Sequence, residues 1–173
     1  MFTADHGDHL GDHQLLFKGP EQYEQITRVP MIWADPAIGA RLDSDGIGQT
    51  HDIGVSILAR AKVAPAYGMQ GRSLVAEGSV GREAALIQYD QQDGVSGLGE
   101  HPRVHTLRNA RWRLSIFDGV SEGELCDLDT DPDEFTNLWD DPSAEKAKSA
   151  LLEQMVRLQI AVADRMPLPT GMA

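Results

Sequence analysis

The chain has 173 residues, of which 41% are hydrophobic and 24% are charged, a composition typical of one compact globular unit and not of a disordered chain. Lys and Arg number 15 against 27 Asp and Glu, so the formal net charge is −12. This excess of negative charge disfavours nucleic acids and anionic membrane surfaces as partners, since both are themselves negatively charged. No apolar run approaches the ~20 residues of a membrane-spanning helix. A single cysteine, Cys126, rules out an internal disulfide and is compatible with a reducing compartment such as the cytoplasm.

The first part of the chain predicts pieces of a parallel sheet joined by polar loops. Residues 1–4 have the pattern of a strand end that runs straight into a polar loop over residues 5–13. A free chain terminus is usually polar and loose, so we expect sequence upstream of this opening to be missing. Residues 29–34 predict a buried strand that ends at an Asp-Pro pair. Thr50 is a candidate N-cap for a helix with an apolar stripe made of Ile53, Ile57, Leu58 and Ala61.

The second part predicts a small antiparallel sheet and a final helix. Short apolar runs at turn-like spacing predict strands over residues 84–89, 104–107, 112–117 and 124–128. Asp141-Pro142 is a typical helix start, and a one-face apolar stripe follows it: Ala147, Leu151, Met155, Leu158 and Val162. The last residues, 167–173, predict a disordered or surface-bound end. The fold class is therefore α/β, with a parallel-sheet fragment in residues 1–83 and a small α+β unit in residues 84–173.

The densest group of chemically active side chains is the loop Asp5–His13, which Lys18 follows. This loop holds three carboxylates and three imidazoles, which are good metal ligands, and the end of a parallel strand points into a crevice. Gly7 and Gly11 allow the backbone to turn tightly beside an ion. Lys18 adds a point charge suited to a phosphate or sulfate oxygen. The residues alone leave open a second interpretation, a polar loop whose histidines only form local hydrogen bonds.

Two other metal-binding interpretations fit the spacing less well. His9 and His13 lie four residues apart, but the glutamate that a zinc-protease helix needs beside its first histidine is absent. The acidic residues 127–131 resemble the start of an EF-hand calcium loop. Pro132 and Leu138, however, stand where such a loop needs Gly and Glu. A solvated strand and turn is the simpler interpretation of this acidic tract.

Several motifs occur together in a recognisable order. Residues 3–18 read Thr-Ala-Asp-His-Gly-Asp-His-Leu-Gly-Asp-His-Gln-Leu-Leu-Phe-Lys, and they are followed by Tyr23-Glu24 and by Arg28-Val-Pro30. Gly71-Arg-Ser-Leu74 comes next, and residues 124–138 read Glu-Leu-Cys-Asp-Leu-Asp-Thr-Asp-Pro-Asp-Glu-Phe-Thr-Asn-Leu. In this order the motifs resemble the sulfatase family of the alkaline-phosphatase-like superfamily. The resemblance covers only the C-terminal part of such enzymes, and it implies the C-terminal part of an alkaline-phosphatase-like sandwich.

The resemblance implies roles for individual residues. Asp5 and His6 would be two ligands of a divalent cation, which is usually calcium in the family, although manganese or another transition metal also suits a site with an imidazole ligand. Lys18 would contact the oxygens of the transferred sulfuryl or phosphoryl group and neutralise developing charge. His13 would lie beside the ligands, and Glu24 would be structural.

The implied function is hydrolysis of a small-molecule sulfate ester. Two alternatives stay open: a phosphonate or phosphate ester hydrolase of the same superfamily, and a non-catalytic metal-binding module. Sulfatases take their nucleophile from a Cys/Ser-x-Pro-x-Arg motif, which does not occur in this sequence. We therefore expect the chain to lack the N-terminal half of its parent enzyme and to be inactive alone. Cys126 stands where the family usually has Tyr, and we expect it to be a half-buried core residue.

Overall fold

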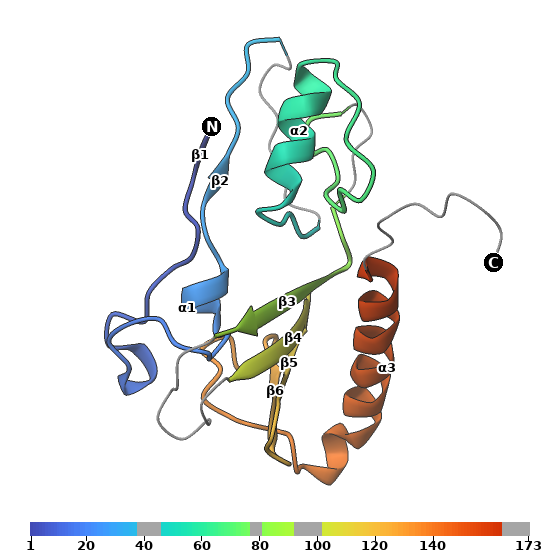
Figure 1. The fold of residues 1–173 in the computed structure, drawn as a ribbon. Coiled ribbons are helices and arrows are strands. Elements are labelled where there is room, and N and C mark those ends of the chain that lie inside the picture. The colour runs from blue at the N-terminus through green and yellow to red at the C-terminus, as the bar shows by residue number, and fades with distance from the viewer. Residues whose placement is uncertain (38–45, 77–80, 92–101, 164–173) are drawn as a thin grey trace, which may run out of the picture.

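The computed structural model describes residues 1–37, 46–76, 81–91 and 102–163 (Figure 1). In chain order its helices and strands are β1 (Phe2–Thr3), η1 (Asp12–Gln14), α1 (Glu24–Thr27), β2 (Met31–Ile32), α2 (Asp52–Arg60), β3 (Ala84–Asp90), β4 (Arg103–Asn109), β5 (Trp112–Phe117), β6 (Gly123–Asp127), η2 (Pro142–Ala144) and α3 (Glu145–Val162). The end predicted over residues 167–173 lies outside the described residues. The division of the chain after residue 83 stays a prediction.

Strands β1 and β2 form a short ribbon at the N-terminal end (Figure 1). The two strands are antiparallel, with Phe2 opposite Ile32, whereas the sequence predicted a parallel fragment. The prediction that residues 29–34 form a buried strand is also wrong at Ile32, which is 57% exposed. Phe2, opposite Ile32 on β1, is 63% exposed. Apolar strand residues are buried only when another layer packs on them, and no described segment covers these two side chains.

Helix α2 buries a different face from the one that its apolar stripe predicts. It begins at Asp52, one residue later than an N-cap at Thr50 would place it. Its buried residues are Asp52, Val55 and Ser56, whereas Ile57 is 53% exposed. Asp52 and Ser56 both accept backbone N–H groups of flanking loops, so polar contacts decide which side of this helix turns inward.

The four strands predicted after residue 83 form one antiparallel sheet in the order β3-β4-β5-β6. A row of leucines crosses this sheet, in which Leu107 pairs with Leu114 and Leu114 pairs with Leu125. None of the three leucines has any exposed surface. Because successive residues of a strand point to opposite faces, these leucines define one apolar face of the sheet.

Helix α3 covers the apolar face of the sheet (Figure 1). Asp141 starts the preceding 3-10 turn, since its carboxylate accepts the N–H of Ser143 at 2.8 Å. The predicted stripe then points inward, with Leu151 and Met155 buried against the sheet. The sequence prediction of this helix and its inner face is therefore confirmed. Within the described residues, no helix has the length and apolar character needed to cross a membrane.

The opposite face of the same sheet is polar and yet buried. Thr106 and Ser115 face each other across β4 and β5, and their hydroxyl oxygens lie 2.8 Å apart. Arg113 on β5 pairs with Cys126 on β6, and both side chains are buried. Tyr23 approaches this face, and its hydroxyl donates to Glu124 on β6 at 3.1 Å. The sheet is therefore covered on both sides, by α3 on one and by the segment that holds α1 on the other.

Candidate functional site

The candidate site is the loop over residues 5–18, which connects β1 to the segment before α1. Its backbone adopts left-handed conformations at three non-glycine residues, with φ of 52° at Leu10, 52° at His13 and 62° at Gln14. Such conformations are unfavourable for residues with a side chain, so surrounding contacts must hold them. At the start of the loop, the Gly7 N–H donates to the Ile26 carbonyl at 2.9 Å and fixes the loop to α1.

Asp5 and His6 direct their side chains toward each other. The His6 N–H donates to Asp5 Oδ1 at 3.0 Å, and His6 Nε2 lies 3.6 Å from Asp5 Oδ2. His6 Nδ1 lies 2.7 Å from the Gly7 carbonyl oxygen. In the neutral imidazole Nδ1 then carries the proton and donates to that carbonyl, which leaves Nε2 as a free lone pair beside the carboxylate.

The charge around Asp5 favours the ionised carboxylate. The pKa of Asp5 lies below its usual range, mainly because the His6 N–H donates to the carboxylate. The positive charge of Lys18 contributes in the same direction. The charge of Lys18 is the smallest of these contributions, and the lysine side chain is exposed.

The two side chains fit part of a divalent-metal site. Metal–ligand bonds of about 2.0–2.6 Å place neighbouring donors about 3–4 Å apart, which agrees with the 3.6 Å between His6 Nε2 and Asp5 Oδ2. Calcium takes about six to eight donors. Within the described ranges, no cluster of three or more His, Cys, Asp or Glu side chains is arranged to hold a metal ion. Asp5 and His6 therefore account for two donors and not for a complete shell.

The other two histidines of the loop lie around the ring of Tyr23. The His13 ring stacks on Tyr23 with centroids 3.9 Å apart and planes 7° apart, and the His9 ring meets Tyr23 edge-on at 5.8 Å. His9 is only 2% exposed, and among the described residues neither of its ring nitrogens finds a hydrogen-bond partner. Burial is the main reason that the pKa of His9 is lowered, so its ring stays neutral near pH 7. These histidines serve as packing groups around Tyr23.

Arg113 is the residue of this region that sequence analysis missed. It is 1% exposed and donates to Glu124, to Glu134 and to the Ser115 hydroxyl. The available signal was a charged residue inside an otherwise apolar strand, which needs a buried partner. Cys126, expected to be half-buried, is fully buried beside it, and burial raises the pKa of its thiol to about 11. A thiol that stays protonated agrees with a core role and not with a nucleophile.

The fold and the order of motifs define a sulfatase-type chain of the alkaline-phosphatase-like class. A sequence profile of the family described as "N-sulphoglucosamine sulphohydrolase, C-terminal" matches residues 11–161. The chain belongs to this family. The resemblance inferred from the sequence motifs is thereby confirmed.

Known proteins similar to the chain include sulfatases and phosphonate monoester hydrolases. Arylsulfatase K of Gallus gallus is 29% identical over 146 residues, which cover 80% of this chain and 27% of that protein. The crystal structure of the phosphonate monoester hydrolase of Agrobacterium radiobacter superposes with a TM-score of 0.84 at 25% identity, over 99% of this chain and 37% of that one. The structure of BT4656 in complex with its substrate D-glucosamine-2-N,6-O-disulfate gives a TM-score of 0.79 at 25% identity, over 98% of this chain and 35% of that one. The chain thus spans about a third of the length of these relatives.

Proposed function

We propose that the chain provides the C-terminal part of a sulfatase-type hydrolase that cleaves sulfate esters of small molecules at a divalent-metal site. The observation that carries this proposal is the match of residues 11–161 to the C-terminal part of a sulfatase family, and the paired side chains of Asp5 and His6 support it. Sulfatases dominate its relatives, and one similar structure holds a sulfated glucosamine.

In the proposed reaction this chain contributes binding and charge. Asp5 and His6 would hold the cation, and a bound divalent cation, calcium or manganese, supplies Lewis-acid polarisation of a sulfate oxygen. Lys18 would donate hydrogen bonds to the nonbridging sulfate oxygens and stabilise the charge that develops on them. The sequence holds no Cys/Ser-x-Pro-x-Arg motif to supply a nucleophile. We therefore infer that the 173-residue chain alone does not turn over an ester.

A phosphonate or phosphate ester is the second candidate substrate. The Agrobacterium phosphonate monoester hydrolase superposes with a TM-score of 0.84, compared with 0.79 for BT4656 with its sulfated sugar. Sulfate and phosphonate esters share a tetrahedral centre with charged oxygens, and the roles proposed for Asp5, His6 and Lys18 suit both.

The first test reads the DNA upstream of the first codon. An in-frame Cys/Ser-x-Pro-x-Arg motif supports the enzyme, whereas a stop codon followed by a ribosome-binding site at Met1 supports a non-catalytic metal-binding module. The second test assays the protein made with that upstream segment on paired aryl sulfate and aryl phosphonate esters. We expect the sulfate ester to be hydrolysed at least tenfold faster. Comparable rates would contradict a sulfatase specificity, and no hydrolysis of either ester would contradict the proposal as a whole.

A further inference from the structure

The polar face of the sheet is organised around one buried guanidinium. Arg113 Nη1 lies 2.6 Å from Glu124 Oε2 and 2.8 Å from Ser115 Oγ, and Nε pairs with Glu134. Arg113 Nη2 lies 3.3 Å from Cys126 Sγ. We call these five residues the Arg113 cluster. Its arginine is 1% exposed, and the Glu134 side chain has no exposed surface.

The cluster reaches the 5–18 loop through the ring of Tyr23. The Arg113 guanidinium carbon lies 4.6 Å from the centroid of this ring, and the Tyr23 hydroxyl donates to Glu124 at 3.1 Å. The His13 ring stacks on the same ring at 3.9 Å. Two planar groups cannot share one ring face at these distances, so Tyr23 lies between the guanidinium of the sheet and the imidazole of the loop.

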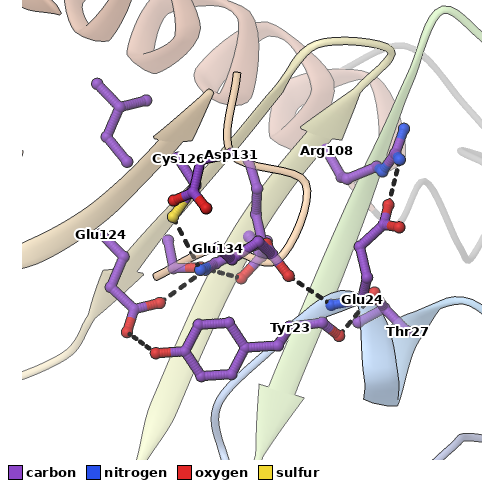
Figure 2. Close-up of polar contacts among 12 residues, drawn as sticks. Tyr23, Glu24, Thr27, Arg108, Glu124, Cys126, Asp131 and Glu134 are labelled. Carbon is purple, nitrogen blue, oxygen red and sulfur yellow. Dashed lines mark hydrogen bonds and ion pairs between the residues drawn. The ribbon is translucent and has the colours of Figure 1, made fainter. Parts of the chain in front are cut away.

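A second connection runs through helix α1. The Glu134 carboxylate accepts a hydrogen bond from Arg113. It also accepts the N–H of Glu24, the first residue of α1, at 2.7 Å (Figure 2). At the other end of this four-residue helix, the Ile26 carbonyl accepts the N–H of Gly7, which directly follows the candidate metal ligands. An ion pair between Arg108 and Glu24 fixes α1 to the sheet as well (Figure 2).

We propose that Arg113 is a positioning residue, which holds the 5–18 loop in its binding conformation through Tyr23 on one route and Glu134 and α1 on the other. The roles of the loop residues themselves rest on the function proposed above. The two routes reach the loop at Gly7, which precedes its left-handed residues, and at His13, which is one of them. A loop with several unfavourable backbone conformations keeps one shape only when contacts from outside the loop hold it.

Amide hydrogen exchange distinguishes a positioning role of the Arg113 cluster from a general stabilising role. A residue that only stabilises the fold makes the whole domain open more often, and amide hydrogen exchange then rises in the sheet and in α3 as well. A positioning residue raises exchange in the loop by more than it raises exchange in the sheet and in α3. Local exchange in the loop is therefore the measurement that separates the two roles.

The first experiment measures amide hydrogen exchange by mass spectrometry in the 173-residue chain with Tyr23 replaced. Tyr23→Leu removes the ring between Arg113 and His13, whereas Tyr23→Phe keeps the ring and loses only the hydroxyl. We expect exchange in peptides from residues 7–16 to accelerate at least tenfold in Tyr23→Leu and less than threefold in Tyr23→Phe. Exchange in the sheet and in α3 should stay within twofold of the wild-type rate. Wild-type loop exchange in a folded Tyr23→Leu chain would overturn the proposal.

A second variant covers the case in which Tyr23→Leu accelerates exchange throughout the chain. Glu134→Gln keeps the size of the side chain but leaves one carbonyl oxygen where two carboxylate oxygens serve Arg113 and Glu24. We expect loop exchange to rise at least threefold. The matched control is Arg111→Gln, which removes a two-point ion pair with Asp127 at 2.9 and 2.7 Å, and it should leave loop exchange unchanged. Equal loop exchange in Glu134→Gln and Arg111→Gln would overturn the proposal.

Kinetics in the protein made with its upstream segment connect positioning to catalysis. We expect Tyr23→Leu to lower kcat at least tenfold while KM changes less than threefold, and Tyr23→Phe to restore most of kcat. If the wild-type protein hydrolyses no sulfate or phosphonate ester, the proposed function fails, and the exchange experiment still decides the role of Arg113. If the wild-type protein is active and Tyr23→Leu has wild-type kcat, the positioning role fails while the proposed function stands.

Discussion

The ion pair between Arg113 and Glu134 allows a quantitative test of how much the buried charges of the Arg113 cluster stabilise each other. Arg113→Met keeps most of the side-chain volume and removes the charge. Glu134, whose side chain has no exposed surface, then keeps a buried carboxylate without its cation. Removal of one partner from a buried ion pair costs about 3–5 kcal/mol, because the other charge stays desolvated and uncompensated. Glu124 is 19% exposed and can regain water, so we assign most of the loss to Glu134.

The double variant gives the decisive comparison. In Arg113→Met/Glu134→Gln the buried charge is absent, so this variant should be more stable than Arg113→Met alone. The losses in free energy of unfolding of Arg113→Met and Glu134→Gln, added together, should exceed the loss of the double variant by a coupling energy of about 2–3 kcal/mol. For a domain of this size, about 3–5 kcal/mol lowers the melting temperature by roughly 6–20 °C.

The assay is chemical denaturation followed by circular dichroism, at a temperature low enough that Arg113→Met stays folded. The low temperature is needed because a folded domain has only about 5–15 kcal/mol of stability in total. The denaturant is urea, because guanidinium chloride is a salt and screens charges. Losses that add within about 0.5 kcal/mol would refute the reasoning, because they would mean that Arg113 and Glu134 do not stabilise each other.

Three further changes test other contacts. Lys18→Ala, in the protein made with its upstream segment, should lower kcat/KM by about 10²–10³-fold, or about 3–4 kcal/mol, whereas the exposed Lys146→Ala should not; equal rates in both variants would contradict the role of Lys18. Burial alone would raise the pKa of Asp52, but hydrogen bonds, led by those from Arg82, hold it below its usual range. The stability that Asp52 provides is therefore present above about pH 4 and lost as pH falls through its lower folded pKa. Denaturation curves of wild type and Asp52→Asn should converge as pH falls below about 4, and a constant difference would contradict this. Gly7→Ala places a Cβ 1.8 Å from a carbonyl oxygen of α1 and should destabilise the chain by about 1–3 kcal/mol in the same assay; wild-type stability would show that loop and helix are not in close contact.

The antiparallel sheet and its helix could be predicted because their signals are local. Each of the four strands is a short apolar run, and the stripe of α3 repeats at helical spacing after a clear start at Asp141. The inner face of α2 could not be predicted in this way. Its burial depends on Asp52 and Ser56, whose partners are backbone groups of loops, and an apolar stripe carries no information about them.

The candidate site was predictable to the extent that its residues are neighbours in the chain. Asp5 and His6 are adjacent in the chain, so their pairing follows from one short motif. The burial of His9 and the stacking of His13 on Tyr23 were not predicted, because they depend on a ring that reaches the loop from outside it.

The sequence by itself determined the family and the four-stranded sheet with its covering helix, and it supplied the residues that we propose for binding a cation and an oxyanion. Only the tertiary structure showed that motifs far apart in the chain meet at Arg113. Tyr23 bonds to a residue 101 positions away, and Glu24 to one 110 positions away. The physical reason is that side-chain periodicity is set by neighbouring residues, whereas a buried charge is stable only when partners from distant segments surround it.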